Sequence, residues 1–227
     1  MEISWLTTHS IMNTPNAIAI LGGTFDPIHN GHIIPAQHVA QWLGVNQVSL
    51  MPTHLPPHKS TVSATATQRV DMVKLVCENN HLFTCDQREL NRTSLSYTVE
   101  TLKEIKQEQP EQSIFFIIGM DSLLTFQQWY QWQEILTLCH LVVNCRPDHS
   151  SNNLSNGLKL LLKQHEISIK TDLLSLDKNA GYIIFPPEIS CDVSSTLIRS
   201  RIKEGVDCQK LIPENVLNYI NQHQLYR

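Results

Sequence analysis

Two histidines and three glycines stand in one short segment near the start of the sequence, LGGTFDPIHNGH, which continues an apolar run. His29 and His32 are three residues apart, so both lie on one side of the first turn if a helix begins near Asn30. The free N–H groups and the dipole of such a turn favour an anion, and the imidazoles add donors. Gly22 and Gly23 allow a phosphate to approach the backbone because no Cβ stands in the way. The segment predicts a phosphate-binding turn; the simpler alternative is a glycine turn with two surface histidines.

A second candidate phosphate-binding segment, VSSTLIR, lies near the other end of the sequence. Ser195 and Thr196, at a predicted helix start, offer hydroxyl and backbone donors. Arg199 is three residues beyond Thr196, so its guanidinium can reach the same side and bind a phosphate through two N–H groups. Taken alone, this pattern is more often a capped helix with a solvated arginine.

The composition restricts the class of ligand. The 227 residues are 41% hydrophobic and 17% charged, with a net charge of −4, and a pI near 6.2 argues against bulk binding of nucleic acid. No apolar run approaches the ~18 residues of a membrane span, and the start lacks the pattern of a signal peptide. Six cysteines without a C-x-x-C pair indicate reduced thiols. We therefore expect a cytoplasmic protein without nucleic-acid or membrane partners, and leave a homo-oligomer open.

Strand and helix patterns alternate along the chain, and they must position the two segments. A fully apolar run at 113–118 is typical of a central parallel strand covered on both faces. The alternation predicts an α/β fold, a doubly wound parallel sheet with helices on both faces and a small helical part at the carboxyl-terminal end. Such sheets bind ligands outside the carboxyl ends of their strands. We interpret residues 1–16 as a flexible N-terminal extension and residues 17–227 as a single domain. Strands are expected at 17–21, 45–51, 82–85, 113–118, 140–144 and 182–185, and helices at 33–43, 67–78, 97–106, 158–164, 194–203 and 213–222, with a Trp-rich helical stretch before the strand at 140–144.

Both segments resemble the signatures of a known superfamily. GGTFDPIHNGH resembles the first signature of the Rossmann-like nucleotidyltransferases with the H-x-G-H motif, and VSSTLIR resembles its partner, I-S-S-T-x-I-R. Val193 replaces the usual isoleucine, which leaves the hydroxyls and Arg199 untouched. The resemblance implies that two helix N-termini face one triphosphate, with His29, His32 and Arg199 as catalytic residues. The ATP-binding residues it implies are Gly22, Gly23, Thr24, Phe25, His29, His32, Gly119, Asp121, Arg146, Ser195, Thr196 and Arg199.

Within that ATP set, Gly119 and Asp121 follow the apolar strand at the predicted carboxyl edge of the sheet. A carboxylate there can accept hydrogen bonds from ribose hydroxyls. By resemblance both residues face the adenosine, and Arg146 lies near the same end. For Asp121 a helix N-cap is an alternative that is compatible with this role.

Four further segments resemble the bacterial nicotinate-nucleotide adenylyltransferases: MPTHLPPHK, ELNRTSLSYTVETL, FFIIGMDSLLTFQQWYQW and VVNCRP. The likeness runs from about residue 17 to the end of the sequence and weakens only across 148–180. It implies transfer of AMP from ATP to nicotinate mononucleotide, giving nicotinate adenine dinucleotide (deamido-NAD) and pyrophosphate in NAD biosynthesis. A sister adenylyl- or cytidylyltransferase would lack the SYT and Trp129 segments. A non-catalytic nucleotide sensor is the other alternative, which the loss of either histidine or of Arg199 would favour.

Aromatic and loop residues suit the mononucleotide. A cationic pyridinium is attracted to an indole face, and the resemblance assigns this stacking to Trp129. It assigns the nicotinate carboxylate to backbone N–H groups near Thr98 and Tyr130. His58 and Lys59, on a proline-rich loop, are candidates for phosphate contact, although a solvated loop charge is nearly as common.

The implied chemistry needs no general base, because the attacking phosphate has a second pKa of about 6 and is largely ionised at neutral pH. Catalysis then consists of in-line alignment and neutralisation of phosphate charge. We expect Mg²⁺ to bridge the β- and γ-phosphates. No carboxylate cluster suggests a protein metal site, so its ligands are expected to be phosphate oxygens and water.

Overall fold

The computed structural model describes residues 16–53, 62–92, 96–144, 154–167, 179–189 and 191–227. His58, Lys59 and Arg146 lie outside this range, as does nearly all of the expected extension at 1–16. The boundaries given for the extension and the domain therefore stay predictions.

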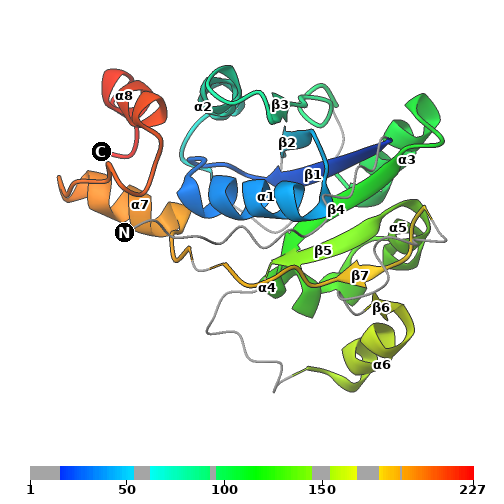
Figure 1. Cartoon of the computed structure of the whole chain (residues 1–227). Coiled ribbons are helices and arrows are strands. Elements are labelled where there is room, and N and C mark those ends of the chain that lie inside the picture. Colours follow the sequence, from blue (N-terminus) through cyan, green and yellow to red (C-terminus); the bar gives the residue numbers. More distant parts are fainter. Residues whose placement is uncertain (1–15, 54–61, 93–95, 145–153, 168–178, 190) are drawn as a thin grey trace, which may run out of the picture.

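Within the described residues, seven parallel strands form one sheet in the order β3-β2-β1-β4-β5-β7-β6 (Figure 1). The order reverses between β1 and β4, which makes their carboxyl ends the expected ligand crevice of a doubly wound sheet. The fold class predicted from the sequence is confirmed. The strands are β1 (Ala17–Gly23), β2 (Val48–Pro52), β3 (Phe83–Cys85), β4 (Ser113–Gly119), β5 (His140–Asn144), β6 (Glu166–Ile167) and β7 (Ile183–Ile184).

Helices cover both faces of the sheet, and the alternation of side chains along β4 explains why. Phe115 and Ile117 belong to a buried cluster with α1, α2, α7 and α8, whereas Ile114, Phe116 and Ile118 belong to a second cluster with α3, α4, α5 and α6. The strand is thus buried on both sides, as its fully apolar sequence indicates. The helices are α1 (Asn30–Leu43), α2 (Ala66–Glu78), α3 (Thr98–Glu108), α4 (Met120–Leu124), α5 (Trp132–Leu138), α6 (Asn156–His165), α7 (Ser195–Lys203) and α8 (Glu214–Gln222), with a 3-10 turn, η1 (Phe126–Gln128).

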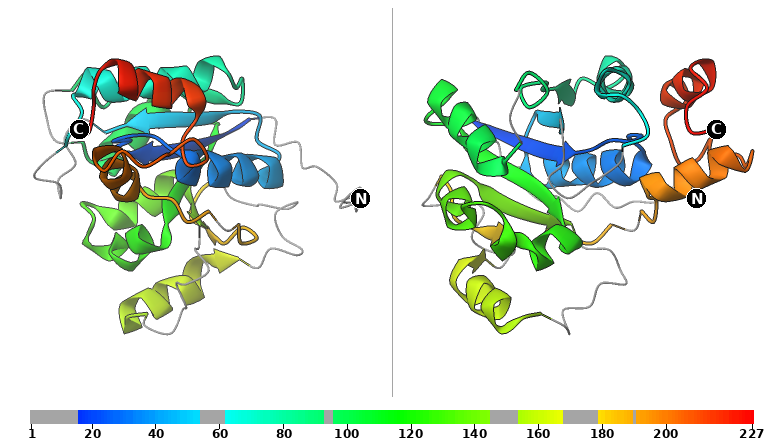
Figure 2. Two further views of the ribbon diagram at one scale, coloured as in Figure 1. Left: turned by 90° about the vertical axis from the view of Figure 1, so that its left-hand side faces the viewer. Right: turned by 180° about the vertical axis from the view of Figure 1, so that it is seen from behind.

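The outer elements lie at opposite ends of this arrangement. α6 with β6 lies at the edge of the sheet opposite to β3, and α7 and α8 lie on the side toward which the strand arrows point (Figures 1 and 2). The carboxyl-terminal helices therefore stand next to the carboxyl ends of the central strands, where a ligand crevice is expected.

Three details differ from the expected elements. The Trp-rich stretch is divided into α4, η1 and α5, because Trp129 is extended (φ −71°, ψ 145°) and Gln131 is left-handed (φ 50°). The second strand begins at Val48 rather than at residue 45, after Gly44 ends α1 in the left-handed conformation (φ 67°). The two-residue strand β6 was not predicted, since two residues carry too little pattern to identify. Across the described ranges, no helix is long and apolar enough to cross a membrane.

Candidate active site

The two histidines meet at the turn between β1 and α1. His29 is the N-cap residue of α1, in extended conformation, and its side chain is only 2% exposed. The ring centroids of His29 and His32 are 3.8 Å apart with the planes tilted by 30°. The ring of Phe25 meets His32 edge-on at 5.1 Å. The imidazoles therefore lie against each other at the start of a helix, where the helix dipole favours an anion. His29 is more buried than a histidine on a surface turn would be.

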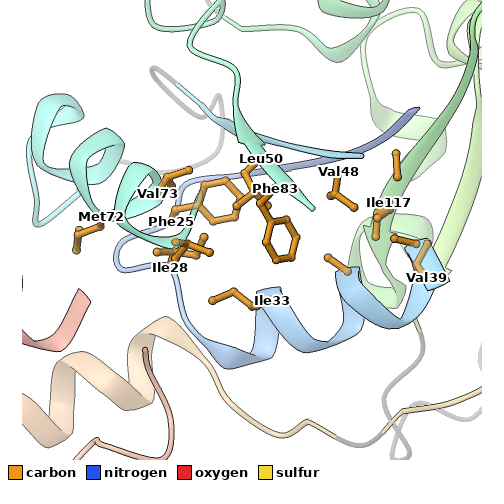
Figure 3. Packing of buried hydrophobic residues seen from close by; sticks show 14 of the residues in the cluster. Phe25, Ile28, Ile33, Val39, Val48, Leu50, Met72, Val73, Phe83 and Ile117 are labelled. Carbon is orange, nitrogen blue, oxygen red and sulfur yellow. The ribbon is translucent and has the colours of Figure 1, made fainter. Parts of the chain in front are cut away.

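The turn itself, residues 24–29, is held in an unusual shape by neighbouring segments. Phe25 is left-handed (φ 50°), and its side chain is buried in the cluster that contains Met72 and Val73 of α2 (Figure 3). The carboxylate of Asp26 accepts hydrogen bonds from the N–H groups of Ser63 (2.8 Å) and Ala64 (3.0 Å). Asp26 was not predicted as a site residue, although it lies inside the signature segment.

A buried arginine of α2 supports the same turn. Arg69 is 1% exposed, and its Nη1 donates to the carbonyl oxygens of Thr24 (2.7 Å) and Thr53 (2.8 Å), which follow β1 and β2. Burial lowers the pKa of the guanidinium, an effect that the charge of Asp26 opposes. The capping box of α2, in which Thr65 and Gln68 exchange hydrogen bonds, fixes where this helix begins. A sequence signal for Arg69 existed, because it lies four residues before Val73, on the apolar face of the helix.

The second signature segment meets the first in space. Ser195 Oγ donates to the carbonyl oxygen of Pro27 (3.1 Å), and Arg199 Nη1 donates to that of Asp26 (2.7 Å), across 168 and 173 residues of sequence. Arg199 Nη2 donates to Thr196 Oγ1 (3.2 Å). The structure therefore brings both predicted segments together, and in it Arg199 braces the histidine turn.

Glycine is required at Gly31, which the sequence interpretation did not single out. A Cβ at Gly31 would lie 2.5 Å from the carbonyl oxygen of Val193 and 2.9 Å from the imidazole Cε1 of His29. A Cβ at Gly23 would lie 2.9 Å from the Phe25 ring, and one at Gly22 would make an ordinary 3.6 Å contact with Phe116. At Gly31 and Gly23 the absence of a side chain therefore allows neighbouring atoms of the protein itself to pack closely against the backbone. Gly31 allows the two signature segments to touch.

A small cavity of about 150 Å³ opens beside His32 at the carboxyl ends of β1, β4 and β5. Gly119 is in its wall, and a Cβ built there would meet no atom of the described residues within 4 Å. Gly119 is also the N-cap of α4, so Asp121 lies in the first turn of that helix and is not its cap, which excludes the N-cap alternative. The carboxylate of Asp121 is on an exposed residue. The cavity is lined by Leu21, Gly31, His32, Pro35, Ile117, Ile118, Gly119, Asn144, Ile189 and Cys191.

A larger and more apolar cavity of about 510 Å³ is lined by three of the five predicted mononucleotide residues. Thr98, Trp129 and Tyr130 all line it, and the rings of Tyr97 and Tyr130 lie 4.7 Å apart at its wall. The indole of Trp129 is supported from the core by Phe126, which it meets at 5.6 Å and 61°. Thr98 is the first residue of α3, where backbone N–H groups have no acceptor within the helix. The other lining residues are Thr53, Ser96, Ser122, Thr125, Gln128 and Ile135.

A buried carboxyl group lies behind this cavity. Glu89 is 5% exposed, and its Oε1 accepts a hydrogen bond from Thr101 Oγ1 at 2.9 Å. Arg92 Nη1 in turn donates to Thr101 Oγ1 (2.7 Å), and Arg92 also pairs with Glu104. Burial raises the pKa of Glu89, and the hydrogen bond from Thr101 opposes that rise. Arg92 therefore belongs to a network of protein side chains at the start of α3.

The donors at the histidine turn and at the start of α7 suit phosphate better than a metal ion. They are the imidazoles of His29 and His32, the Ser195 hydroxyl and the Arg199 guanidinium, and of these only His32 lines the small cavity. In the described part of the chain, no group of three or more His, Cys, Asp or Glu side chains could hold a metal ion. The five cysteines of that part form no disulfide, and burial raises the pKa of the Cys77 thiol to about 12 and that of Cys85 to about 11. Those two thiols therefore stay protonated near neutral pH.

Comparison with known proteins agrees with this geometry. Residues 20–201 match the family described as Cytidylyltransferase-like. A protein of Serratia proteamaculans named "Probable nicotinate-nucleotide adenylyltransferase" is 43% identical over 211 residues, which is 92% of this chain and 94% of that protein. A protein of Psychromonas ingrahamii with the same name is 41% identical over 211 residues, 93% of this chain and 97% of that protein.

Solved structures show the same fold. The Plasmodium falciparum nicotinic acid mononucleotide adenylyltransferase complexed with NaAD matches with a TM-score of 0.70 at 18% identity, covering 93% of this chain and 97% of that one. The same enzyme complexed with APC matches with a TM-score of 0.67 at the same identity and coverage. At this identity the likeness concerns the fold alone.

Proposed function

We propose, because this chain belongs to the cytidylyltransferase-like family and within it to the nicotinate-nucleotide adenylyltransferases, that it transfers AMP from ATP to nicotinate mononucleotide. The products are nicotinate adenine dinucleotide and pyrophosphate, and the reaction is a step of NAD biosynthesis. The observation that carries the proposal is the contact between the histidine turn and the Ser195–Arg199 part of α7, in a protein that has a separate cavity lined by Trp129.

The histidine turn is the proposed site of phosphate chemistry. His29 and His32 donate to the phosphates of ATP and to the charge that develops on them, at the N-terminus of α1 where the helix dipole adds to the attraction. Ser195 and Thr196 stand at the start of α7 and supply hydroxyl donors. Arg199 holds the turn through the Asp26 carbonyl oxygen and stands within reach of the same phosphates. No residue has to remove a proton, because the attacking phosphate is already ionised near neutral pH.

The adenosine is proposed to occupy the cavity at the carboxyl ends of β1, β4 and β5. Gly119 leaves space there for a ligand, and two residues later Asp121 is an exposed residue whose carboxylate can accept hydrogen bonds from ribose hydroxyls. Gly22, Gly23, Thr24 and Phe25 form the neighbouring end of β1 and its turn. Arg146 stays a prediction for this site.

The mononucleotide is proposed to occupy the larger cavity. Its cationic pyridinium stacks on Trp129, and its carboxylate accepts hydrogen bonds from backbone N–H groups near Thr98 and Tyr130. A nicotinamide would present its NH₂ group to the same donors, so that one donor faces another. Leaving such groups unpaired in a dry pocket costs ~1–3 kcal/mol each. His58 and Lys59 stay predictions for the phosphate of this substrate.

A metal ion is proposed to arrive with the ATP. The described residues of the site offer hydrogen-bond donors that suit an anion, and they hold no cluster of metal ligands. Mg²⁺ would therefore be held by phosphate oxygens and water, and when bound it would neutralise charge on the β- and γ-phosphates. A cytoplasmic location and the absence of nucleic-acid partners are likewise part of the proposal, and the oligomeric state stays open.

One assay tests the proposed function. The purified chain is given ATP and Mg²⁺ with nicotinate mononucleotide, nicotinamide mononucleotide or phosphopantetheine, and pyrophosphate release is followed. We expect kcat/KM for the acid to exceed that for the amide by roughly tenfold to several hundredfold. Equal rates for both mononucleotides would overturn the nicotinate assignment, and release with phosphopantetheine alone would indicate a sister transferase.

A further inference from the structure

The last residues of the sequence lie against the histidine turn. The hydroxyl of Tyr226 donates a hydrogen bond to Asp26 Oδ1 at 2.8 Å, across 200 residues of sequence. Asp26 is 6% exposed and Tyr226 is half-buried, so this contact is partly buried. Burial raises the pKa of Tyr226, and the negative charge of Asp26 raises it further, while Arg199 and Arg69 oppose both effects. The tyrosine therefore keeps its proton and acts as a donor.

Three groups from outside the turn converge on the Asp26 carboxylate. The N–H groups of Ser63 and Ala64 reach it at 2.8 and 3.0 Å, and Tyr226 approaches Oδ1 from the carboxyl-terminal segment. The Asp26 carbonyl oxygen accepts from Arg199 at 2.7 Å. The backbone at Asp26 is thus fixed by segments that are distant in sequence, and Tyr226 ties the segment after α8 to it.

The position of Asp26 matters because its neighbour is strained. Phe25 is held at φ 50°, a left-handed conformation that a bulky residue keeps only when its surroundings enforce it. The ring centroids of Phe25 and His32 are 5.1 Å apart, and those of His32 and His29 are 3.8 Å apart. A displacement at Asp26 would therefore pass through Phe25 to the two imidazoles.

The segment that carries Tyr226 is anchored independently of the turn. On α8, Tyr219 donates to Asp71 Oδ2 of α2 at 2.9 Å, and Asn215 Nδ2 donates to the carbonyl oxygen of Leu75 at 2.6 Å. These contacts hold α8 on α2 whether or not Tyr226 bonds to Asp26. Removal of the Tyr226 hydroxyl should consequently leave α8 in place on α2.

We propose that Tyr226 is a positioning residue for adenylyl transfer, which acts through Asp26 and Phe25 on the geometry of His29 and His32. The proposal rests on the proposed function of the histidine turn. In this role Tyr226 contacts no reacting atom. Its hydroxyl keeps the histidine turn in the conformation in which both imidazoles face the phosphates.

The test compares Tyr226→Phe with Tyr219→Phe in the full chain. Each variant loses one hydroxyl that donates to an aspartate, and both keep the aromatic ring, but Tyr219 does not touch the turn. We expect Tyr226→Phe to lower kcat about tenfold or more, since small displacements of catalytic groups have effects of ~10²-fold per Å. KM for nicotinate mononucleotide should stay within about twofold, and Tyr219→Phe should keep kcat within about twofold of the wild type.

Two further measurements separate positioning from folding and from the proposed function. Isothermal titration with ATP gives the number of binding sites per chain, which measures the folded fraction. The measured kcat is then divided by that fraction to give kcat per site. ATP affinity without mononucleotide should fall several-fold in Tyr226→Phe alone, a result that is informative even if the wild type transfers no AMP. Equal kcat per site and equal ATP affinity in the two variants would overturn the positioning role. A wild type that binds ATP but releases no pyrophosphate would overturn the proposed function instead.

Discussion

Replacement of Gly31 by alanine should separate the two signature segments of the active site. The new Cβ would stand 2.5 Å from the carbonyl oxygen of Val193, and ordinary contact begins at 3.4 Å, so one of the two must move by about 0.9 Å. Val193 precedes α7, and its carbonyl oxygen belongs to the backbone, so it cannot rotate away as a side chain would. The Cβ would also press on His29, whose Cε1 lies 2.9 Å away.

The size of the effect follows from two opposing free energies. Alanine favours a helix over glycine by ~0.8–1.0 kcal/mol, which alone would stabilise α1. Overpacking costs ~1–3 kcal/mol. We therefore expect a net loss of about 1 kcal/mol in the free energy of unfolding, which corresponds to a fall in Tm of about 2–4 °C for a chain of this size. Activity should fall much further, by about 100-fold in kcat, because the displacement of nearly 0.9 Å occurs at the histidine turn itself.

Gly119→Ala is the matched control, because its Cβ would meet nothing within 4 Å in the part of the chain that the structure describes, and its backbone (φ −84°, ψ 164°) suits alanine. It should leave Tm nearly unchanged and raise KM for ATP, since the methyl group enters the proposed adenosine cavity. Tm is measured by calorimetry, and kcat and KM by pyrophosphate release. If Gly31→Ala had the Tm and the kcat of the wild type, the contact between the two segments would not exist as described, and the reasoning would be refuted.

Three further predictions concern the histidines, the substrate cavity and the buried glutamate. His29→Ala or His32→Ala should lower kcat by at least ~100-fold, the scale of removing one preorganised donor; near-normal turnover in steady-state assays of either variant would contradict the proposed mechanism. Trp129→Ala should lower kcat/KM for both mononucleotides in similar proportion, because both pyridinium rings carry the same formal charge; a collapse of their ratio would mean that Trp129 orients the carboxylate. For Glu89, whose pKa is raised by burial in the folded state, the wild type should lose stability relative to Glu89→Gln as the pH rises above ~4.3, the usual pKa of an unfolded glutamate. Denaturant unfolding of both proteins between pH 4 and 8 measures this difference, and a difference that does not vary with pH would show that Glu89 is not destabilised in its ionised form.

The fold class and the two signature segments could be predicted from the sequence because each depends on patterns of residues that are close together in the chain. The unbroken apolar run of β4 requires a strand that is buried on both faces, and the structure places its side chains in two separate clusters. The three-residue spacing of His29 and His32 places both on one side of a helix start, and their rings are in contact. Such patterns depend only on the geometry of a strand or a helix, so no knowledge of the rest of the chain is needed.

The resemblance to a known family predicted Thr98, Trp129 and Tyr130 as mononucleotide residues, and the structure places all three in the wall of one cavity. The sequence did not predict the break in the Trp-rich stretch, which has enough apolar residues for a continuous helix. In the structure Trp129 is extended and Gln131 is left-handed. No glycine or proline marks this break, so local residue types do not predict it.

Only the tertiary structure decided which distant groups hold the histidine turn. Arg69, Arg199 and Tyr226 all converge on residues 24–26 from separate elements. Arg69 and Arg199 each have a local sequence signal, but neither signal indicates a contact with residues 24–26. A tyrosine after a helix is common on protein surfaces. Their roles arise from the order of the strands, which brings α2, α7 and the segment after α8 to the carboxyl end of β1. That order is fixed by the packing of the whole core, and a contact across 200 residues leaves no periodic trace in the sequence.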